Sequence, residues 1–132
     1  MDIRISFGLE NDVKNIAQRE FKGKSLLKEL DDYVVLDLET TGLDPDYDDI
    51  IEIGAVRVEN KEIVDQFESF VNPGYEIDGF ITGLTGITNQ MLQEAPDVNS
   101  VLPRFLSFIG DSIIVAHNAN FDINFLYDAC VR

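Results

Sequence analysis

Cysteine and basic side chains are scarce in this chain of 132 residues. Cys130 is its one cysteine, which excludes an intramolecular disulfide and any cysteine-rich zinc site. Ten basic residues stand against 25 acidic ones, a formal net charge of −15. This balance is the opposite of what a protein needs to bind nucleic acid mainly through the phosphate backbone. It does not exclude an enzyme that handles a strand end through metal ions, because the cations supply positive charge locally.

Long apolar runs are also absent. The sequence contains no continuous apolar stretch of about eighteen residues, the length of a membrane span, and no signal-peptide pattern in residues 1–10. Apolar residues make up 45% of the chain and charged residues 27%, which is typical of a globular domain. We therefore expect a soluble, cytoplasmic protein with no membrane contact.

The basic residues that are present gather near the amino terminus. Six of the ten lie in residues 1–28, and apolar residues at helical spacing predict a helix over Asn11–Phe21. We predict an N-terminal basic helical segment over residues 1–30 and a main domain over residues 31–132. The segment fits either a basic arm that touches nucleic acid or a partner subunit, or a small helix packed over the edge of a sheet.

The most informative stretch is Tyr33–Leu43, an apolar run that carries two acids and then breaks at Gly42. Side chains alternate along a strand, so Asp37 and Glu39 share one face, opposite an apolar face. We expect a buried strand with little water-facing surface, on which two adjacent like charges are costly unless a cation neutralises them. Hard oxygen ligands favour Mg²⁺ or Mn²⁺. The alternative is an edge strand whose acids simply face water.

Two segments resemble the motifs of one nuclease family. Residues 34–43 read Val-Val-Leu-Asp-Leu-Glu-Thr-Thr-Gly-Leu, similar to the first motif of the DnaQ-like DEDD superfamily of 3′–5′ exonucleases. Residues 115–126 read Val-Ala-His-Asn-Ala-Asn-Phe-Asp-Ile-Asn-Phe-Leu and resemble its second motif. The Thr-Gly-Ile-Thr segment at 85–88, where the family often has His in place of Thr85, is similar to the polymerase C-type proofreading segment. The chain is identified as a member of this family.

The pattern of elements agrees with the fold that this resemblance implies. We predict a first strand that begins at Tyr33 and carries both Asp37 and Glu39, and further strands over Ile50–Glu59, Glu62–Val71 and Ser112–Ala116. We predict helices over Asn89–Glu94, Val98–Ile109 and Asn120–Cys130. The first three strands form an antiparallel meander, and the fourth strand joins it in parallel. The expected fold is α/β, a ribonuclease H-like mixed sheet with flanking helices that is incomplete at its C-terminal end.

The resemblance also implies a set of site residues. Asp37, Glu39 and Asp122 would be the catalytic carboxylates that hold two Mg²⁺ or Mn²⁺ ions, although a helix-capping role is the ordinary alternative for Asp122. A capping role for Thr88 accounts for that residue but not for Gly86 and Ile87. The implied substrate contacts are Thr40, Thr41, Gly42, Leu43, Thr85, Gly86, Ile87, His117, Asn118, Asn120 and Phe121.

The function that the resemblance implies is removal of nucleotides from a single-stranded DNA 3′ end, with RNA as an open alternative substrate. Subunits of DNA polymerase III, or a polymerase domain, are the implied partners. The family's third motif, a His followed five residues later by an Asp, is absent, so we expect a fragment of a longer exonuclease or polymerase and a weak nuclease on its own. The alternative function is a non-catalytic module that binds a polymerase subunit or a single-stranded end.

Overall fold

The computed structural model describes residues 4–6, 24–25 and 30–131. The helix predicted over Asn11–Phe21 lies outside these residues. The division into an N-terminal segment and a main domain therefore stays a prediction. Within the described residues, no helix has the length and apolar character that crossing a membrane requires.

A six-stranded mixed sheet forms the centre of the structure, in the order β2-β1-β6-β3-β4-β5. Strands β3, β4 and β5 are the predicted antiparallel meander, and β6 pairs with β3 in parallel. Two short strands extend the sheet beyond β6, since β1 pairs in parallel with β6 and β2 in parallel with β1. The strands are β1 Arg4–Ser6, β2 Lys24–Ser25, β3 Tyr33–Thr40, β4 Ile50–Glu59, β5 Glu62–Phe70 and β6 Ile113–Val115.

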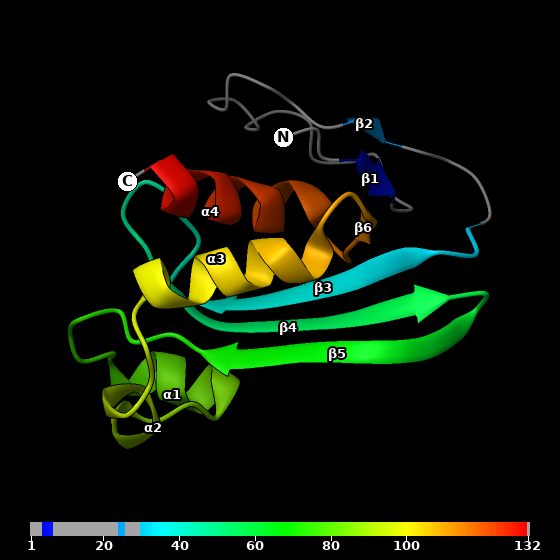
Figure 1. Cartoon of the computed structure of the whole chain (residues 1–132). Helices are drawn as coiled ribbons and strands as arrows, with labels where there is room; N and C mark the ends of the chain where they lie inside the picture. Colours follow the sequence, from blue (N-terminus) through cyan, green and yellow to red (C-terminus); the bar gives the residue numbers. More distant parts are fainter. Residues whose placement is uncertain (1–3, 7–23, 26–29, 132) are drawn as a thin grey trace.

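Two long helices, α3 (Val98–Ile109) and α4 (Ala119–Val131), lie side by side over the sheet (Figure 1). The apolar stripe of α3 joins the inward-facing residues of the sheet in one core, with Phe105 fully buried and its ring centroid 5.5 Å from that of Phe67 on β5. Burying a side chain of this size contributes about 2–3 kcal/mol. The larger core lies between the helices and this face of the sheet. The main core consists of Val34, Leu36, Leu38, Ile50, Ile53, Ala55, Val71, Val101, Leu102, Phe105, Ile109, Ile114, Ala116, Ala119, Ile123, Phe125 and Leu126.

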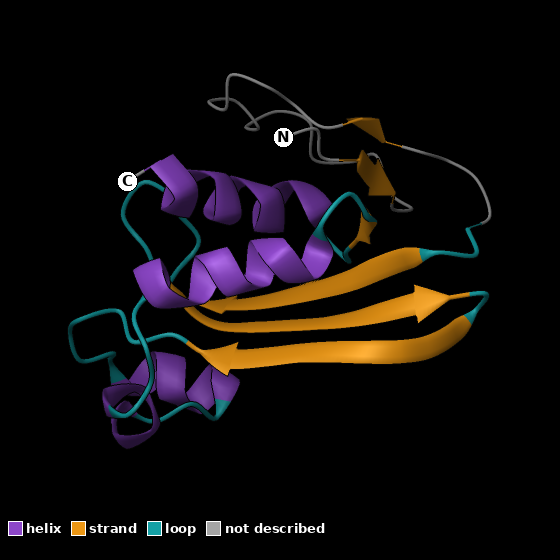
Figure 2. Cartoon of the chain, viewed as in Figure 1, coloured by secondary structure: helices purple, strands orange, loops and turns teal. Residues whose placement is uncertain are grey.

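Two short helices, α1 (Gly79–Thr85) and α2 (Asn89–Gln93), lie at the end of the sheet where β3 and β5 finish (Figure 2). The sequence did not predict α1, which contains two glycines. Asp78 caps its first turn by accepting a hydrogen bond from the Ile81 amide, and Gly86 ends it in the left-handed conformation at φ 77°. A second, smaller core holds these helices to the sheet: Ile51, Ile77, Ile81, Ile87 and Leu92, with Phe70 packed against them.

Candidate active site

The two faces of β3 differ sharply in exposure. Its apolar residues alternate inwards as predicted, while Asp37 is exposed and Glu39 half-buried on the other face. The expectation that this strand has little water-facing surface is wrong, because α3 and α4 cover only one face and Val35 remains 38% exposed on the other. The edge-strand alternative is also wrong, since β3 lies between β6 and β4. The acids therefore project from the interior of the sheet onto its open face.

Neighbouring strands add carboxylates to this open face. Glu52 on β4 lies directly opposite Glu39, and Glu68 on β5 pairs with Gly54, which in turn lies opposite Asp37. Burial raises the pKa of Glu39, and the Asp37 charge raises it further. The pKa of Glu52 is raised by burial first and then by the charges of Glu68, Glu39 and Asp37. Sequence reasoning missed Glu52, although its place in the predicted strand pairing was a usable signal.

Asp122 supplies a third predicted carboxylate from the first turn of α4. It is 6% exposed, and among the described residues it is the one buried charged side chain. Burial, followed by the charges of Asp37 and Glu39, raises its pKa to about 7. The strand and helix acids are therefore close enough to repel one another. Within the described part of the chain, no hydrogen-bond donor reaches the Asp122 carboxylate.

The capping role considered for Asp122 belongs to another residue. The Asn118 side chain accepts a hydrogen bond from the Phe121 amide at 3.4 Å, and the Asn118 carbonyl accepts one from the Asp122 amide at 3.2 Å. Asn118 and its neighbour His117 are exposed, whereas Asn120 and Phe121 are half-buried. Among the described residues, neither a capping role nor a hydrogen bond accounts for the burial of the Asp122 carboxylate.

The donor set fits a hard divalent cation in its chemistry. Asp37, Glu39 and Asp122 provide only carboxylate oxygens, and their mutual repulsion is what a bound cation relieves. In the described residues, however, no three His, Cys, Asp or Glu side chains are already grouped closely enough to form a ready-made metal cluster. Cation binding would have to draw these carboxylates together.

The turn that follows the acids is closed by hydrogen bonds to its own loop. Thr40 donates its hydroxyl to the Gly42 carbonyl at 2.6 Å, and the Thr41 amide donates to the Asp49 carbonyl at 2.8 Å. A Cβ at Gly42 would lie 2.3 Å from Oδ2 of Asp48, so a larger residue would displace that carboxylate. Leu43 projects outward from this closed turn and is 84% exposed.

Local structure accounts for the whole segment 85–88. The Thr85 hydroxyl donates to the Ile81 carbonyl at 2.9 Å and accepts from the Ile87 amide at 3.1 Å. Thr88 caps α2 by accepting from the Met91 amide. The expectation that capping leaves Gly86 and Ile87 unexplained is wrong, because Gly86 ends α1 and Ile87, 3% exposed, fills the smaller core.

Strand register connects this segment with the acids. Phe70, which packs against the smaller core, lies opposite Glu52, and Glu52 lies opposite Glu39. Glu39, Glu52 and Phe70 thus form a row across the three strands, and the α1–α2 element lies at the Phe70 end of that row. At the start of α4, the charges of Asp37 and Glu39 raise the pKa of Asp122, which connects the second motif with the strand acids.

Comparison with known proteins agrees with this arrangement. The family model described as Exonuclease, of RNase T type, matches residues 34–132. A DNA polymerase III PolC-type protein of Caldanaerobacter subterraneus subsp. tengcongensis is 46% identical over 124 residues, 94% of this chain and 9% of the relative. The chain thus spans about 9% of the length of that relative.

Solved structures show the same fold. Exonuclease X in complex with 5′ overhanging duplex DNA is 31% identical, with a TM-score of 0.61 over 70% of this chain and 52% of that one. Product-bound exonuclease I matches with a TM-score of 0.69 over 78% of this chain and 26% of that one; at 19% identity it supports the fold alone. The match to the family model covers most of the chain, and the chain therefore belongs to the DnaQ-like DEDD exonuclease family.

Proposed function

We propose that this chain is a metal-dependent 3′–5′ exonuclease module of the proofreading type, which removes nucleotides from a DNA 3′ end within a longer replicative polymerase. The observation that carries the proposal is the Asp122 carboxylate, which is buried, lacks a hydrogen-bond donor among the described residues, and interacts with the charges of Asp37 and Glu39. An uncompensated buried charge is costly, and a cation shared with the strand acids would offset that cost.

Asp37, Glu39 and Asp122 would hold Mg²⁺ or Mn²⁺. When bound, these ions would activate a water molecule and stabilise the leaving 3′ oxygen. Asp37 faces solvent, so water and a phosphodiester have access to it from the open face, while Asp122 presents its carboxylate from the protein side. Gly42, Leu43, Thr85 and Gly86 would contact the terminal nucleotide, together with the residues around the start of α4.

Charge limits the substrate contact to a strand end. With a net charge of −15, the chain as a whole repels a phosphate backbone, and bound cations at the carboxylates would offset that repulsion locally. We therefore expect little affinity for duplex DNA in the absence of divalent metal. The name of the PolC-type relatives supports a polymerase as the physical partner that delivers the 3′ end. RNA would be a poorer substrate only if contacts to the sugar discriminate against the 2′ hydroxyl.

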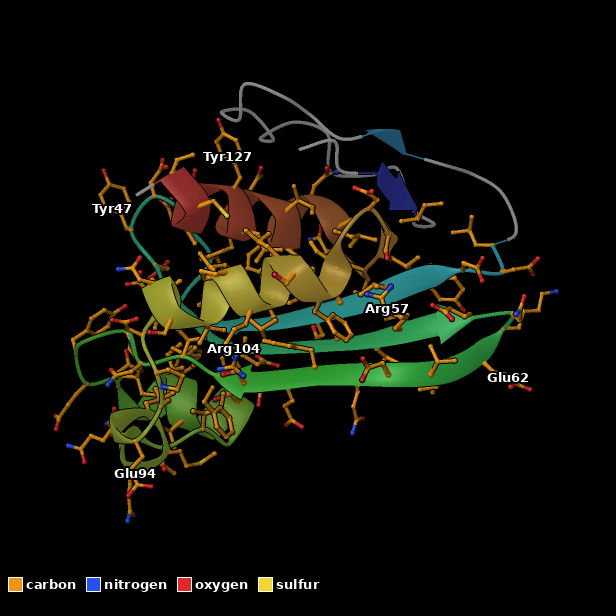
Figure 3. The ribbon with its side chains drawn as sticks, viewed as in Figure 1. Tyr47, Arg57, Glu62, Glu94, Arg104 and Tyr127 are labelled. Carbon is orange, nitrogen blue, oxygen red and sulfur yellow. The ribbon has the colours of Figure 1, made fainter. Side chains whose placement is uncertain are left out.

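The first experiment measures Mn²⁺ binding to the purified chain by water proton relaxation. Asp37→Asn, Glu39→Gln and Asp122→Asn should each weaken binding more than about tenfold, because each removes one anionic ligand. Glu62→Gln is the matched control, since this glutamate is exposed at the start of β5, at the opposite end of the sheet from α1 and α2 (Figure 3). Equal binding by all four variants would overturn the metal assignment.

The second experiment separates catalysis from binding. A 3′-labelled single strand is incubated with the chain and Mg²⁺ or Mn²⁺, and release of mononucleotide is followed with time. We expect slow release that Asp37→Asn abolishes. Retained binding to the strand without any release, unchanged by Asp37→Asn, would favour the non-catalytic module.

A further inference from the structure

Tyr75 links two loops that are distant in sequence. Its hydroxyl donates to Oδ2 of Asp49 at 2.8 Å and lies 3.1 Å from the hydroxyl oxygen of Thr41. Because the phenol proton is directed to Asp49, the second pair is a hydrogen bond when the Thr41 proton is turned to Tyr75 instead of to Oδ1 of Asp48, 3.4 Å away. Tyr75, in the segment after β5, thus contacts both Thr41 and Asp49, the two ends of the loop that follows β3.

Thr41 connects the Tyr75 hydroxyl to the turn at residues 41–43. Its hydroxyl oxygen accepts from the Asp49 amide at 3.0 Å and lies 3.4 Å from Oδ1 of Asp48. The same Asp48 carboxylate also accepts from the Asp44 amide at 2.9 Å and fills the space beside Gly42. A shift of Thr41 therefore moves the turn that carries Leu43.

The other end of the link is equally well fixed. Ile77, two residues after Tyr75, donates its amide to the Asn89 side chain at 2.8 Å and accepts from the same side chain at 3.1 Å. Asn89 is the first residue of α2, directly after the Thr88 cap. Tyr75 is therefore anchored to the α1–α2 element that contains Thr85 and Gly86.

We propose that Tyr75 is a positioning residue, which sets the spacing between the turn at Thr41–Leu43 and the α1–α2 element, the two walls of the terminal-nucleotide site. The inference rests on the proposed function, because it assumes that these two segments flank the nucleotide. Tyr75 acts through Thr41 and does not itself touch the reacting atoms. It is 48% exposed, so loss of its hydroxyl leaves the core packing intact.

The test uses Tyr75→Phe, which keeps the ring and removes both hydroxyl hydrogen bonds. We expect the affinity for thymidine 5′-monophosphate in saturating Mn²⁺ to fall about three- to tenfold, the scale of one or two net hydrogen bonds. The affinity for Mn²⁺ alone should not change, since the three carboxylates lie on other elements. Tyr47→Phe is the matched control and should behave as wild type. Tyr47 lies in the loop that follows β3, is 83% exposed and points outward (Figure 3).

A double variant identifies the route. Thr41→Val removes one of the two groups that the Tyr75 hydroxyl contacts, so Tyr75→Phe should cause a smaller further loss when added to it, the part that the Asp49 hydrogen bond contributes. Thr41→Ser retains the hydroxyl and should restore sensitivity to Tyr75→Phe. Additive losses in the Thr41→Val background would overturn the proposed route.

The outcomes also distinguish this inference from the proposed function. Mn²⁺-dependent nucleotide binding that is equal in wild type, Tyr75→Phe and Tyr47→Phe would overturn the role of Tyr75 and leave the proposed function standing. Absence of Mn²⁺-dependent nucleotide binding in the wild-type chain would overturn both. A parallel loss of Mn²⁺ affinity in Tyr75→Phe would show a general structural role and contradict positioning.

Discussion

The two faces of β3 have opposite effects on stability, although alternate residues of one strand form them. Val34, Leu36 and Leu38 point into the core beneath α3 and α4, whereas Val35, Asp37 and Glu39 point onto an open face where Glu52 and Glu68 add two further carboxylates. The first face gains free energy from burial. The second face loses free energy by placing like charges together, and only a ligand of opposite charge makes that arrangement favourable. Stability and function are thus separated by a single step along the strand.

Leu36→Ala should produce the largest loss of stability on the covered face. Leu36 is 2% exposed, and deletion of three buried carbons leaves a cavity that costs about 2–5 kcal/mol of unfolding free energy. Urea denaturation followed by circular dichroism measures this cost. Val35→Ala on the open face is the control, with an expected cost below about 1 kcal/mol. Equal costs for the two variants would contradict the difference between the faces.

Asp122 should make the metal-free chain less stable as pH rises. Its pKa is raised to about 7 in the folded state from an ordinary value of 3.8, so the folded state binds the extra proton between these pH values. Stability is therefore highest below pH 4 for this group and falls until the pH exceeds 7, by on the order of 2 kcal/mol once solvent screening is considered.

Denaturation midpoints between pH 4 and pH 8 test this prediction. Asp122→Asn should remove most of the downward slope, while Asp65→Asn, an exposed aspartate on β5, should preserve it. Mn²⁺ should also raise the wild-type midpoint more at pH 8 than at pH 5.5, because the cation competes with the proton for Asp122. A slope that survives Asp122→Asn would assign the effect to the other acids of the open face.

Sequence patterns predicted the covered face well. The apolar period defined α3 at Val98–Ile109, and alternation along β3 assigned Leu36 to the core and Asp37 to the other face. These features are local, since each depends on the spacing of neighbouring residues. The pairing of the meander followed from the short reversal at residues 59–61.

The missed features depend on contacts between distant residues. Exposure of Asp37 depends on whether a second layer also covers the acidic face, and no residue of β3 encodes that. Helix α1 contains Gly79 and Gly83, which disfavour a helix, and forms because it is capped at both ends and buries Ile81. The Tyr75 link joins residues 34 positions apart, and nothing in the composition of either loop indicates it.

The smallest expected effect lies in the hairpin between β4 and β5, at the far end of the sheet. Asn60 and Lys61 form its two-residue turn and both have positive φ, 51° and 65°, as a type I′ turn requires. Lys61→Gly should relieve strain at the second position and stabilise the chain by about 0.5–1 kcal/mol. The same substitution removes the exposed ion pair between Lys61 and Asp31, 3.7 Å long. Losing this pair costs roughly a few tenths of a kcal/mol, which offsets only part of the gain.

This hairpin variant separates rigidity of the sheet from the chemistry of its open face. Thermal denaturation should show a small rise in Tm, and Mn²⁺ affinity should equal that of wild type, because the turn lies at the opposite end of β4 from Glu52. Lys61→Ala provides the control, since it removes the same ion pair and retains the Cβ that disfavours positive φ. A rise in Tm for Lys61→Ala as large as that for Lys61→Gly would contradict the backbone explanation. A change in Mn²⁺ affinity in Lys61→Gly would mean that the distant turn influences the spacing of the carboxylates. The stability of the sheet and the chemistry of its open face would then be coupled.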